Sequence, residues 1–172
     1  VTTKREIAVL PIFVDIAHFK TASPGALAER FQGFSSKLLW VGRFEAEKNP
    51  SLALDAFASA APHDACLIFL GKGSMEASLR ERARTLGVLE RAFFEGVQDP
   101  APYYALADLV LLTSDYEGYG RVIIEALASG TPVLSRDVGV GKMEGALIAT
   151  GDFADARKQR KVSPPEMPPE SQ

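Results

Sequence analysis

The chain has 172 residues, a length that corresponds to one domain with a self-sufficient core, two small domains being the outside case. An apolar fraction of 47% beside a charged fraction of 24% excludes collagen-like, membrane-embedded and wholly disordered classes. The net charge of −3 argues against a nucleic-acid-binding protein that relies on bulk positive charge, so we expect no nucleic-acid partner, although a local basic pocket is compatible with it.

Short apolar runs alternate along the chain with segments of helical character. Strands are expected at 37–42, 66–70, 92–95, 109–112 and 132–135, with a sixth candidate at 146–149. Helices are expected between them at 50–61, 75–86, 100–107 and 121–128. Asn49 and Pro50 are typical of an N-cap and a first helical residue, Ser74 is expected to cap the second helix, and Gly87 is expected to end it.

The expected strands lack polar alternation, which is typical of strands buried on both faces of a sheet. Because helices separate them, the sequence predicts an α/β fold with a Rossmann-like, doubly wound parallel sheet of about six strands. Residues 39–43 and 68–72 resemble each other at the spacing of one strand–helix unit, about 30 residues. We interpret that similarity as architecture and not as a repeat family.

The two ends of the chain differ from its middle in composition and in hydrophobic pattern. We expect 1–36 to be an irregular, linker-like segment and 37–150 to form the Rossmann-like domain. Within 151–172, a basic cluster at 157–161 precedes several prolines, a composition typical of a solvated, disordered end. We interpret this end as a helix remnant with a disordered tail, and partner binding there is the less favoured alternative.

The single cysteine, Cys66, excludes an intramolecular disulfide and a cysteine metal cage, and it suits a reducing compartment. Its place in an apolar run predicts a buried core residue. No apolar run approaches the length of a membrane span, and the first residues lack the basic-then-apolar pattern of a signal peptide. We therefore expect a cytoplasmic protein.

The loops after the strands are where a ligand is expected, because open parallel sheets bind ligands beyond the carboxyl ends of their strands. Those loops are 43–49, 71–74, 96–99, 113–120 and 136–143. The first carries Arg43 and Lys48, and the second carries Lys72. Each cation alone is best explained by solvation, but several on one edge of the sheet predict an anion site, with phosphate as the obvious anion.

The most informative stretch is 115–132. Gly118 and Gly120 precede a helix, where they let the backbone approach a ligand and present amides at a positive helix end. Glu125 stands in a helix that is apolar nearly all round, so it needs a partner: either a structural salt bridge or backbone bond, or a ligand, which we favour. Glu117 and Glu125 are spaced to grip two parts of one extended ligand.

The sequence does not match other common nucleotide-binding or catalytic motifs. Two G-x-G pairs have Glu76 and Glu144 where the dinucleotide fingerprint needs its third glycine. The sequence contains no phosphate loop of the G-x-x-x-x-G-K-[ST] type and no G-x-S-x-G nucleophile turn. Asp115 and Glu117 could hold a divalent metal, but two loop carboxylates are a weak signal.

Segment 117–132 closely resembles the E-x7-E segment of the retaining glycosyltransferases of family 4, also called group 1, which have the GT-B fold. It meets nearly every position of the pattern E-G-[FY]-G-x-x-x-x-E-A-[ML]-A-x-G-x-P-V. Further similarities to the family lie at 41–48 (V-G-R-x-x-x-E-K), 70–73, 107–108 and 137–144. Together, 37 to about 148 resemble the C-terminal, donor-binding half of such an enzyme.

The resemblance implies a role for each matched residue. Arg43 and Lys48 would hold the diphosphate of the donor, Glu117 the sugar hydroxyls, and Glu125 the ribose; Arg43, Lys48 and Glu117 form the expected catalytic set. The remaining expected donor contacts are Gly42, Lys72, Gly118, Tyr119, Gly120 and Arg121. The implied donor is a UDP-, GDP- or ADP-sugar, with no metal and no other cofactor, and 95–98 is expected near the base. A hexose would be transferred with retention, by front-face attack without a protein nucleophile.

Three departures from the family pattern qualify the resemblance. Segment 11–15 lacks the Asn-Gly of the interdomain turn, Val140 and Gly141 disturb the glycine-rich donor loop, and no acceptor-binding half is present. The favoured hypothesis is a donor half that is inactive without an N-terminal domain for a glycan, lipid or small-molecule acceptor, with peripheral membrane association of the full enzyme as an option. The alternative is a non-catalytic nucleotide-sugar-binding module or a subunit of a split enzyme.

Overall fold

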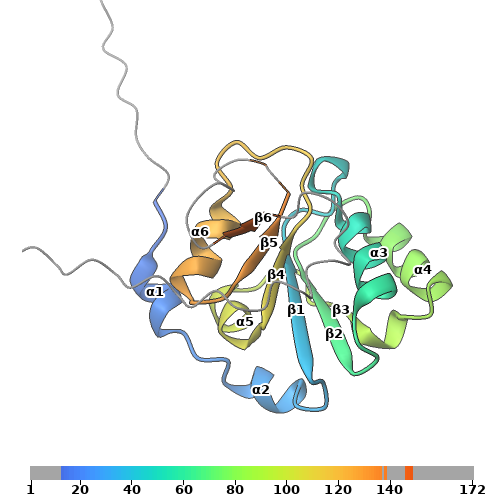
Figure 1. Ribbon diagram of the computed structural model, residues 1–172, viewed down its shortest axis with the longest axis horizontal. Helices are drawn as coiled ribbons and strands as arrows, with labels where there is room; N and C mark the ends of the chain where they lie inside the picture. The colour runs from blue at the N-terminus through green and yellow to red at the C-terminus, as the bar shows by residue number, and fades with distance from the viewer. Residues whose placement is uncertain (1–12, 137, 139–145, 149–172) are drawn as a thin grey trace, which may run out of the picture.

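Among the residues that the structure describes, six strands form one parallel sheet, against the expected number of about six. Figure 1 shows this sheet with its helices. A computed structural model describes residues 13–136, 138 and 146–148. The strands are β1 (Ser36–Val41), β2 (Ala65–Leu70), β3 (Ala92–Phe94), β4 (Leu109–Leu112), β5 (Val133–Ser135) and β6 (Ala146–Ile148), in the spatial order β3-β2-β1-β4-β5-β6. The order reverses where β1 pairs with β4, and ligands of open α/β sheets bind at such a reversal.

Helices cover both faces of this sheet (Figure 1). One face carries α3 (Pro50–Ala60) and α4 (Glu76–Thr85), and the other carries α5 (Ala101–Leu106) and α6 (Arg121–Ala128). Side chains alternate between the two layers, so that on β1 Leu39 packs toward α5 and α6 whereas Trp40 packs toward α3 and α4. Every residue of β2 is buried, which explains why its sequence shows no polar alternation.

From residue 13 onward, two short helices precede β1, and the expectation of an irregular segment over 1–36 is wrong for them. They are α1 (Ile16–Thr21) and α2 (Ala26–Arg30). Phe19 of α1 and Phe31, directly after α2, are buried in the layer that α5 and α6 form. The burial of these two rings, and not helix propensity, stabilises helices this short.

The predictions for the residues at the helix ends are confirmed in part. Asn49 caps α3 from a left-handed conformation (φ 46°, ψ 53°), and its side chain accepts a hydrogen bond of 3.2 Å from the Leu52 amide. Gly87 follows α4 with a φ of +69°. The prediction for Ser74 is wrong: its amide and hydroxyl donate to the carboxylate of Glu45, at 2.9 and 2.7 Å, and α4 begins two residues later. These bonds lower the pKa of Glu45.

Cys66 is buried in β2, which confirms its interpretation as a core residue, and burial raises the pKa of its thiol to about 11. In the part of the chain that the structure describes, every helix is too short or too polar to cross a membrane. The tail at 151–172 and most of the donor loop at 136–143, including Asp137, Val140 and Gly141, lie outside the described residues, so the expectations for them stay predictions.

Candidate functional site

The loops after β1 and β4 lie together at the carboxyl edge of the sheet. The Asp115 amide donates to the Glu47 carbonyl at 2.9 Å. The Thr113 hydroxyl donates to the Asn49 carbonyl at 2.8 Å and accepts from the indole of Trp40 at 2.9 Å. Because Trp40 and Thr113 are buried, these bonds fix the two loops against each other at the reversal of strand order.

This arrangement brings Lys48 and Glu117 into direct contact. The Lys48 Nζ lies 2.7 Å from Oε1 of Glu117, and the Ser114 hydroxyl donates to the same oxygen at 2.6 Å. The Lys48 side chain is 22% exposed and that of Glu117 is 11% exposed. Two of the three expected catalytic residues thus form one half-buried pair that remains open to the surface.

Arg43 and Lys72 lie on neighbouring loops without joining that pair. The Arg43 guanidinium donates to Oε1 of Glu47 at 2.7 Å, and its side chain is 71% exposed. Lys72 is exposed, and its side chain passes Gly96. Both side chains follow strands at the carboxyl edge of the sheet, and their role toward a diphosphate stays a prediction. Gly42 follows β1 directly, and its amide donates to the Leu70 carbonyl at 3.0 Å.

The glycine-rich turn leads into α6. Gly120 adopts a left-handed conformation (φ 79°, ψ 49°) at the N-cap of α6, and it has no side chain to cap the first amides of that helix. Gly118 is exposed and has open space where a Cβ would be, while Tyr119 is half-buried. This end of an eight-residue helix has the polarity that attracts an anion.

Glu125 is buried, at 6% exposure, and both of its carboxylate oxygens have partners. The Tyr104 hydroxyl donates to Oε2 at 3.0 Å, and Arg121 donates to Oε1 at 3.1 Å. Burial raises the pKa of Tyr104 well above its ordinary value, so the phenol remains a donor. The structural interpretation of Glu125 therefore has a physical basis, and its role toward ribose stays a prediction. Tyr104 is not among the residues predicted from the sequence.

A second set of ion pairs holds the loop after β3. Glu95 accepts from the Arg30 guanidinium at 2.6 and 2.7 Å and from the Tyr103 hydroxyl at 3.1 Å. The His18 ring lies 3.0 Å from Oδ1 of Asp99, and that hydrogen bond raises the pKa of His18 and lowers the pKa of Asp99. The residues that precede β1 thereby hold the loop in which the base contacts are expected.

Asp115 and Glu117, a weak metal-binding candidate in the sequence, form two different ion pairs. Asp115 pairs with Arg136, while Glu117 pairs with Lys48. Among the described residues, no three His, Cys, Asp or Glu side chains are grouped as a metal site would need. The expectation of a reaction without a metal stays a prediction.

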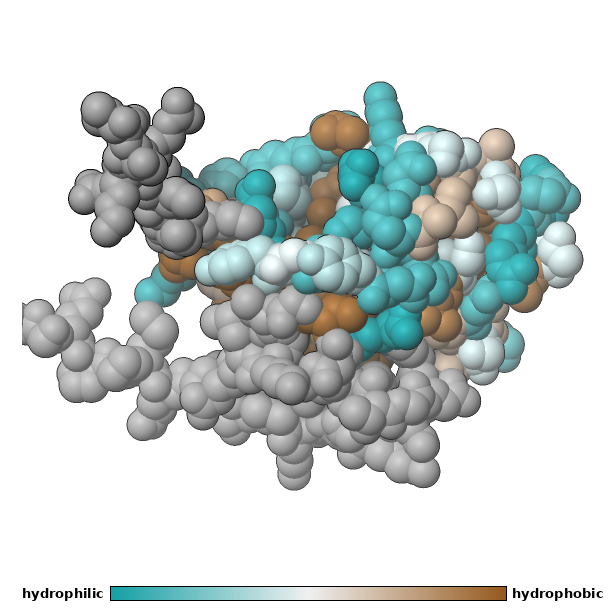
Figure 2. All heavy atoms as spheres, turned by 90° about the horizontal axis from the view of Figure 1, so that it is seen from above, coloured by the Kyte–Doolittle hydropathy of each residue, from teal (hydrophilic) through white to brown (hydrophobic). Residues whose placement is uncertain are grey.

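Figure 2 looks down on the edge at which the strands end. Hydrophilic side chains make up much of its described surface, and apolar residues interrupt it singly. Val97, in the loop after β3, and Tyr116, in the loop after β4, are among the large exposed apolar side chains.

Comparison with known proteins places this geometry in a family. The model of the family described as glycosyl transferases group 1 matches residues 35–160. Alpha-monoglucosyldiacylglycerol synthase of Streptococcus pneumoniae is 30% identical over 185 aligned positions, which cover 95% of this chain and 42% of that protein. Mannosylfructose-phosphate synthase of Agrobacterium fabrum is 31% identical, with 76% of this chain and 32% of that protein covered. The chain spans less than half the length of these relatives.

Solved structures agree with that assignment. HepE of Anabaena in complex with UDP-glucose has a TM-score of 0.73 at 25% identity, with 84% of this chain and 44% of that chain covered. The C-terminal domain of a group 1 glycosyl transferase from Francisella tularensis has a TM-score of 0.70 at 18% identity, covers 85% and 86% of the two chains, and supports the fold alone. The chain belongs to the group 1 glycosyltransferases, and its α/β fold with a parallel sheet matches that of GT-B glycosyltransferases.

Proposed function

We propose that this chain is the donor-binding part of a glycosyltransferase of family 4 that transfers a hexose from a nucleoside diphosphate sugar with retention of configuration. The observation that carries the proposal is the Lys48–Glu117 pair, which lies where β1 and β4 end. A cation for the diphosphate and an acceptor for sugar hydroxyls adjoin there, in a chain of this family.

The chemistry follows from charge. Breaking the bond between the sugar and the phosphate leaves a nucleoside diphosphate with additional negative charge, and cations already in position stabilise it. Lys48, Arg43 and the N-terminal end of α6 would supply that stabilisation. Glu117 is paired with Lys48, and Glu125 accepts hydrogen bonds from Tyr104 and Arg121. Both carboxylates are therefore held in place to position the hydroxyl groups of the donor. That arrangement supports a reaction in which neither glutamate acts as the nucleophile.

The relatives suggest which ligands to test first. HepE is described in complex with UDP-glucose, which makes UDP the first probe for this chain. The name of the pneumococcal relative, alpha-monoglucosyldiacylglycerol synthase, supports a lipid among the possible acceptors. We propose that the acceptor binds outside this chain, on an acceptor domain, and that the chain alone transfers no sugar. A cytoplasmic enzyme without a metal ion remains our expectation.

Calorimetric titration with UDP, GDP and ADP tests the proposal. We expect one of these diphosphates to bind with a dissociation constant of about 1 mM or tighter. Glu125→Gln keeps the side chain's shape but weakens its acceptance of hydroxyl donors, so we expect about a fivefold or greater loss of affinity in a variant that still folds cooperatively on thermal unfolding. The matched control is Glu90→Gln, an exposed position on the short turn η2 (Leu89–Arg91), which should bind as the wild type does.

Two results would count against the proposal. If none of the three diphosphates binds at millimolar concentration, the chain is not a donor-binding domain. Binding that Glu125→Gln leaves unchanged would reduce Glu125 to a structural residue. A partner chain or a longer upstream reading frame that supplies an acceptor domain would favour the enzyme over the alternative of a non-catalytic module.

A further inference from the structure

The carboxylate of Glu125 has two very different partners. Tyr104 is fully buried and donates to Oε2 at 3.0 Å, whereas the Arg121 side chain, which donates to Oε1 at 3.1 Å, is 58% exposed. A carboxylate has about four acceptor positions on its two oxygens. These two bonds therefore leave roughly two positions open. That number matches the two hydroxyl donors of a ribose.

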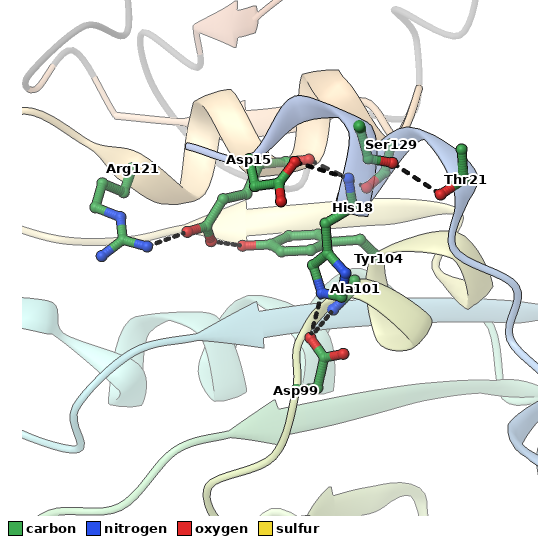
Figure 3. Close-up of polar contacts among 10 residues, drawn as sticks. Asp15, His18, Thr21, Asp99, Ala101, Tyr104, Arg121 and Ser129 are labelled. Atoms are coloured by element: carbon green, nitrogen blue, oxygen red, sulfur yellow. Dashed lines mark hydrogen bonds and ion pairs between the residues drawn. The ribbon is translucent and has the colours of Figure 1, made fainter. Parts of the chain in front are cut away.

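Tyr104 is held firmly by residues around it. The Thr131 hydroxyl donates to its backbone carbonyl at 2.8 Å, and the ring of Phe19 packs edge-on against it with the centroids 5.7 Å apart. Its helix α5 begins at Ala101, whose amide is bonded to Asp99 (Figure 3). The phenol hydroxyl is thus a fixed point in the core, since packing on several sides determines the orientation of the ring.

We propose that Tyr104 is a positioning residue of the ribose subsite: its buried hydroxyl fixes the Glu125 carboxylate with its remaining acceptor positions available to the two ribose hydroxyls. The inference rests on the proposed function, in which Glu125 binds the ribose. Tyr104 does not touch the nucleotide itself. Without its hydroxyl only the exposed Arg121 side chain would orient the carboxylate, and the paired acceptor geometry that recognises a ribose would be lost.

The test is the ability of the chain to distinguish UDP from 2′,3′-dideoxy-UDP, which lacks both hydroxyls. For the wild-type chain we expect UDP to bind about tenfold more tightly, the effect of one or two hydrogen bonds to a charged group. In Tyr104→Phe the ratio of the two affinities should fall to about 2 or less, through weaker binding of UDP and unchanged binding of the dideoxy analogue.

Tyr103→Phe is the matched control. It is the same substitution one residue earlier in α5, and its hydroxyl donates to Glu95 instead of Glu125. The control should keep the wild-type ratio of affinities. Loss of the ratio in both variants would show a general effect of disturbing α5 and would overturn the positioning role. Thermal unfolding identifies which variants fold; if Tyr104→Phe does not, Tyr104→Met removes the hydroxyl with a side chain that repacks easily, and the same fall in ratio is expected.

The outcomes separate this inference from the proposed function. A wild-type chain that binds UDP and its dideoxy analogue equally would overturn the ribose role of Glu125 and this inference with it. A ratio that Glu125→Gln abolishes but Tyr104→Phe preserves would overturn only the inference about Tyr104. We expect the ratio of affinities to be lost in Glu125→Gln and in Tyr104→Phe and to be kept in Tyr103→Phe.

Discussion

Gly71→Ala should destabilise the chain by about 3 kcal/mol or more, because the new methyl group would meet backbone atoms that cannot move aside. Gly71 has a φ of +144°, and a Cβ placed on it would lie 1.8 Å from the carbonyl oxygen of Gly42. The Gly71 amide is bonded to Gly96, and the Gly42 amide to Leu70. Relief of the clash would push the end of β1 away from β2 and displace the loop that carries Arg43 and Lys48.

Urea denaturation measures this loss, and Gly87→Ala is its matched control. Gly87 also has a positive φ, +69°, but a Cβ there would have no neighbour within 4 Å. The control should cost only the conformational penalty of about 1–2 kcal/mol. Equal destabilisation of the two variants would contradict the steric account and leave the unusual backbone conformation as the sole cause. Because the loop moves, nucleoside diphosphate affinity should fall in Gly71→Ala and not in Gly87→Ala.

Lys48→Met should lower the affinity for UDP by about 10- to 100-fold, because a charge-assisted hydrogen bond to the diphosphate is lost. The variant also leaves the 11%-exposed Glu117 carboxylate without its cation, which should cost about 1–2 kcal/mol of stability. Lys37→Met makes the same change of charge at the opposite end of β1, so it controls for net charge. If Lys48→Met binds UDP as tightly as Lys37→Met does, that result would contradict a diphosphate role for Lys48.

Glu117→Gln separates the two members of the pair. Freed of its carboxylate partner, Lys48 should bind UDP as tightly as in the wild type or more tightly. UDP-glucose should not gain affinity in the same way, because its sugar hydroxyls would contact the altered side chain. Parallel calorimetric titrations with UDP and UDP-glucose measure this difference. A Glu117→Gln variant that weakens both ligands equally would show that Glu117 acts by positioning Lys48 and not by contacting the sugar.

The neighbourhood of the site could be predicted from the sequence because a parallel sheet imposes it. Once β1 and β4 are identified as parallel strands, their carboxyl ends must lie at one edge, and Lys48 and Glu117 follow those ends. The N-cap at Asn49 could also be predicted, because asparagine followed by proline is a strong local signal, whereas its left-handed conformation is known only from the structure. Geometry of this kind follows from local chemistry and topology.

The partners of the site residues could not be predicted, because they depend on tertiary packing. The Arg30–Glu95 and His18–Asp99 contacts join residues 65 and 81 positions apart. The sequence shows only that such charges exist. Tyr104 is similar, since its hydroxyl reaches Glu125 across two packed helices. Ser74 was misassigned because Glu45, far away along the chain, competes for its amide and hydroxyl.

A nuclear magnetic resonance titration of the 15N-labelled chain, with the diphosphate that binds most tightly in calorimetry, tests the central claim most directly. If the donor binds where β1 and β4 end, the amides of 42–48 and 113–121 should show the largest saturable shifts. The amides of Lys37 and Asp108, at the amino ends of those strands, should stay in place. Saturable shifts confined to other parts of the chain would contradict the account.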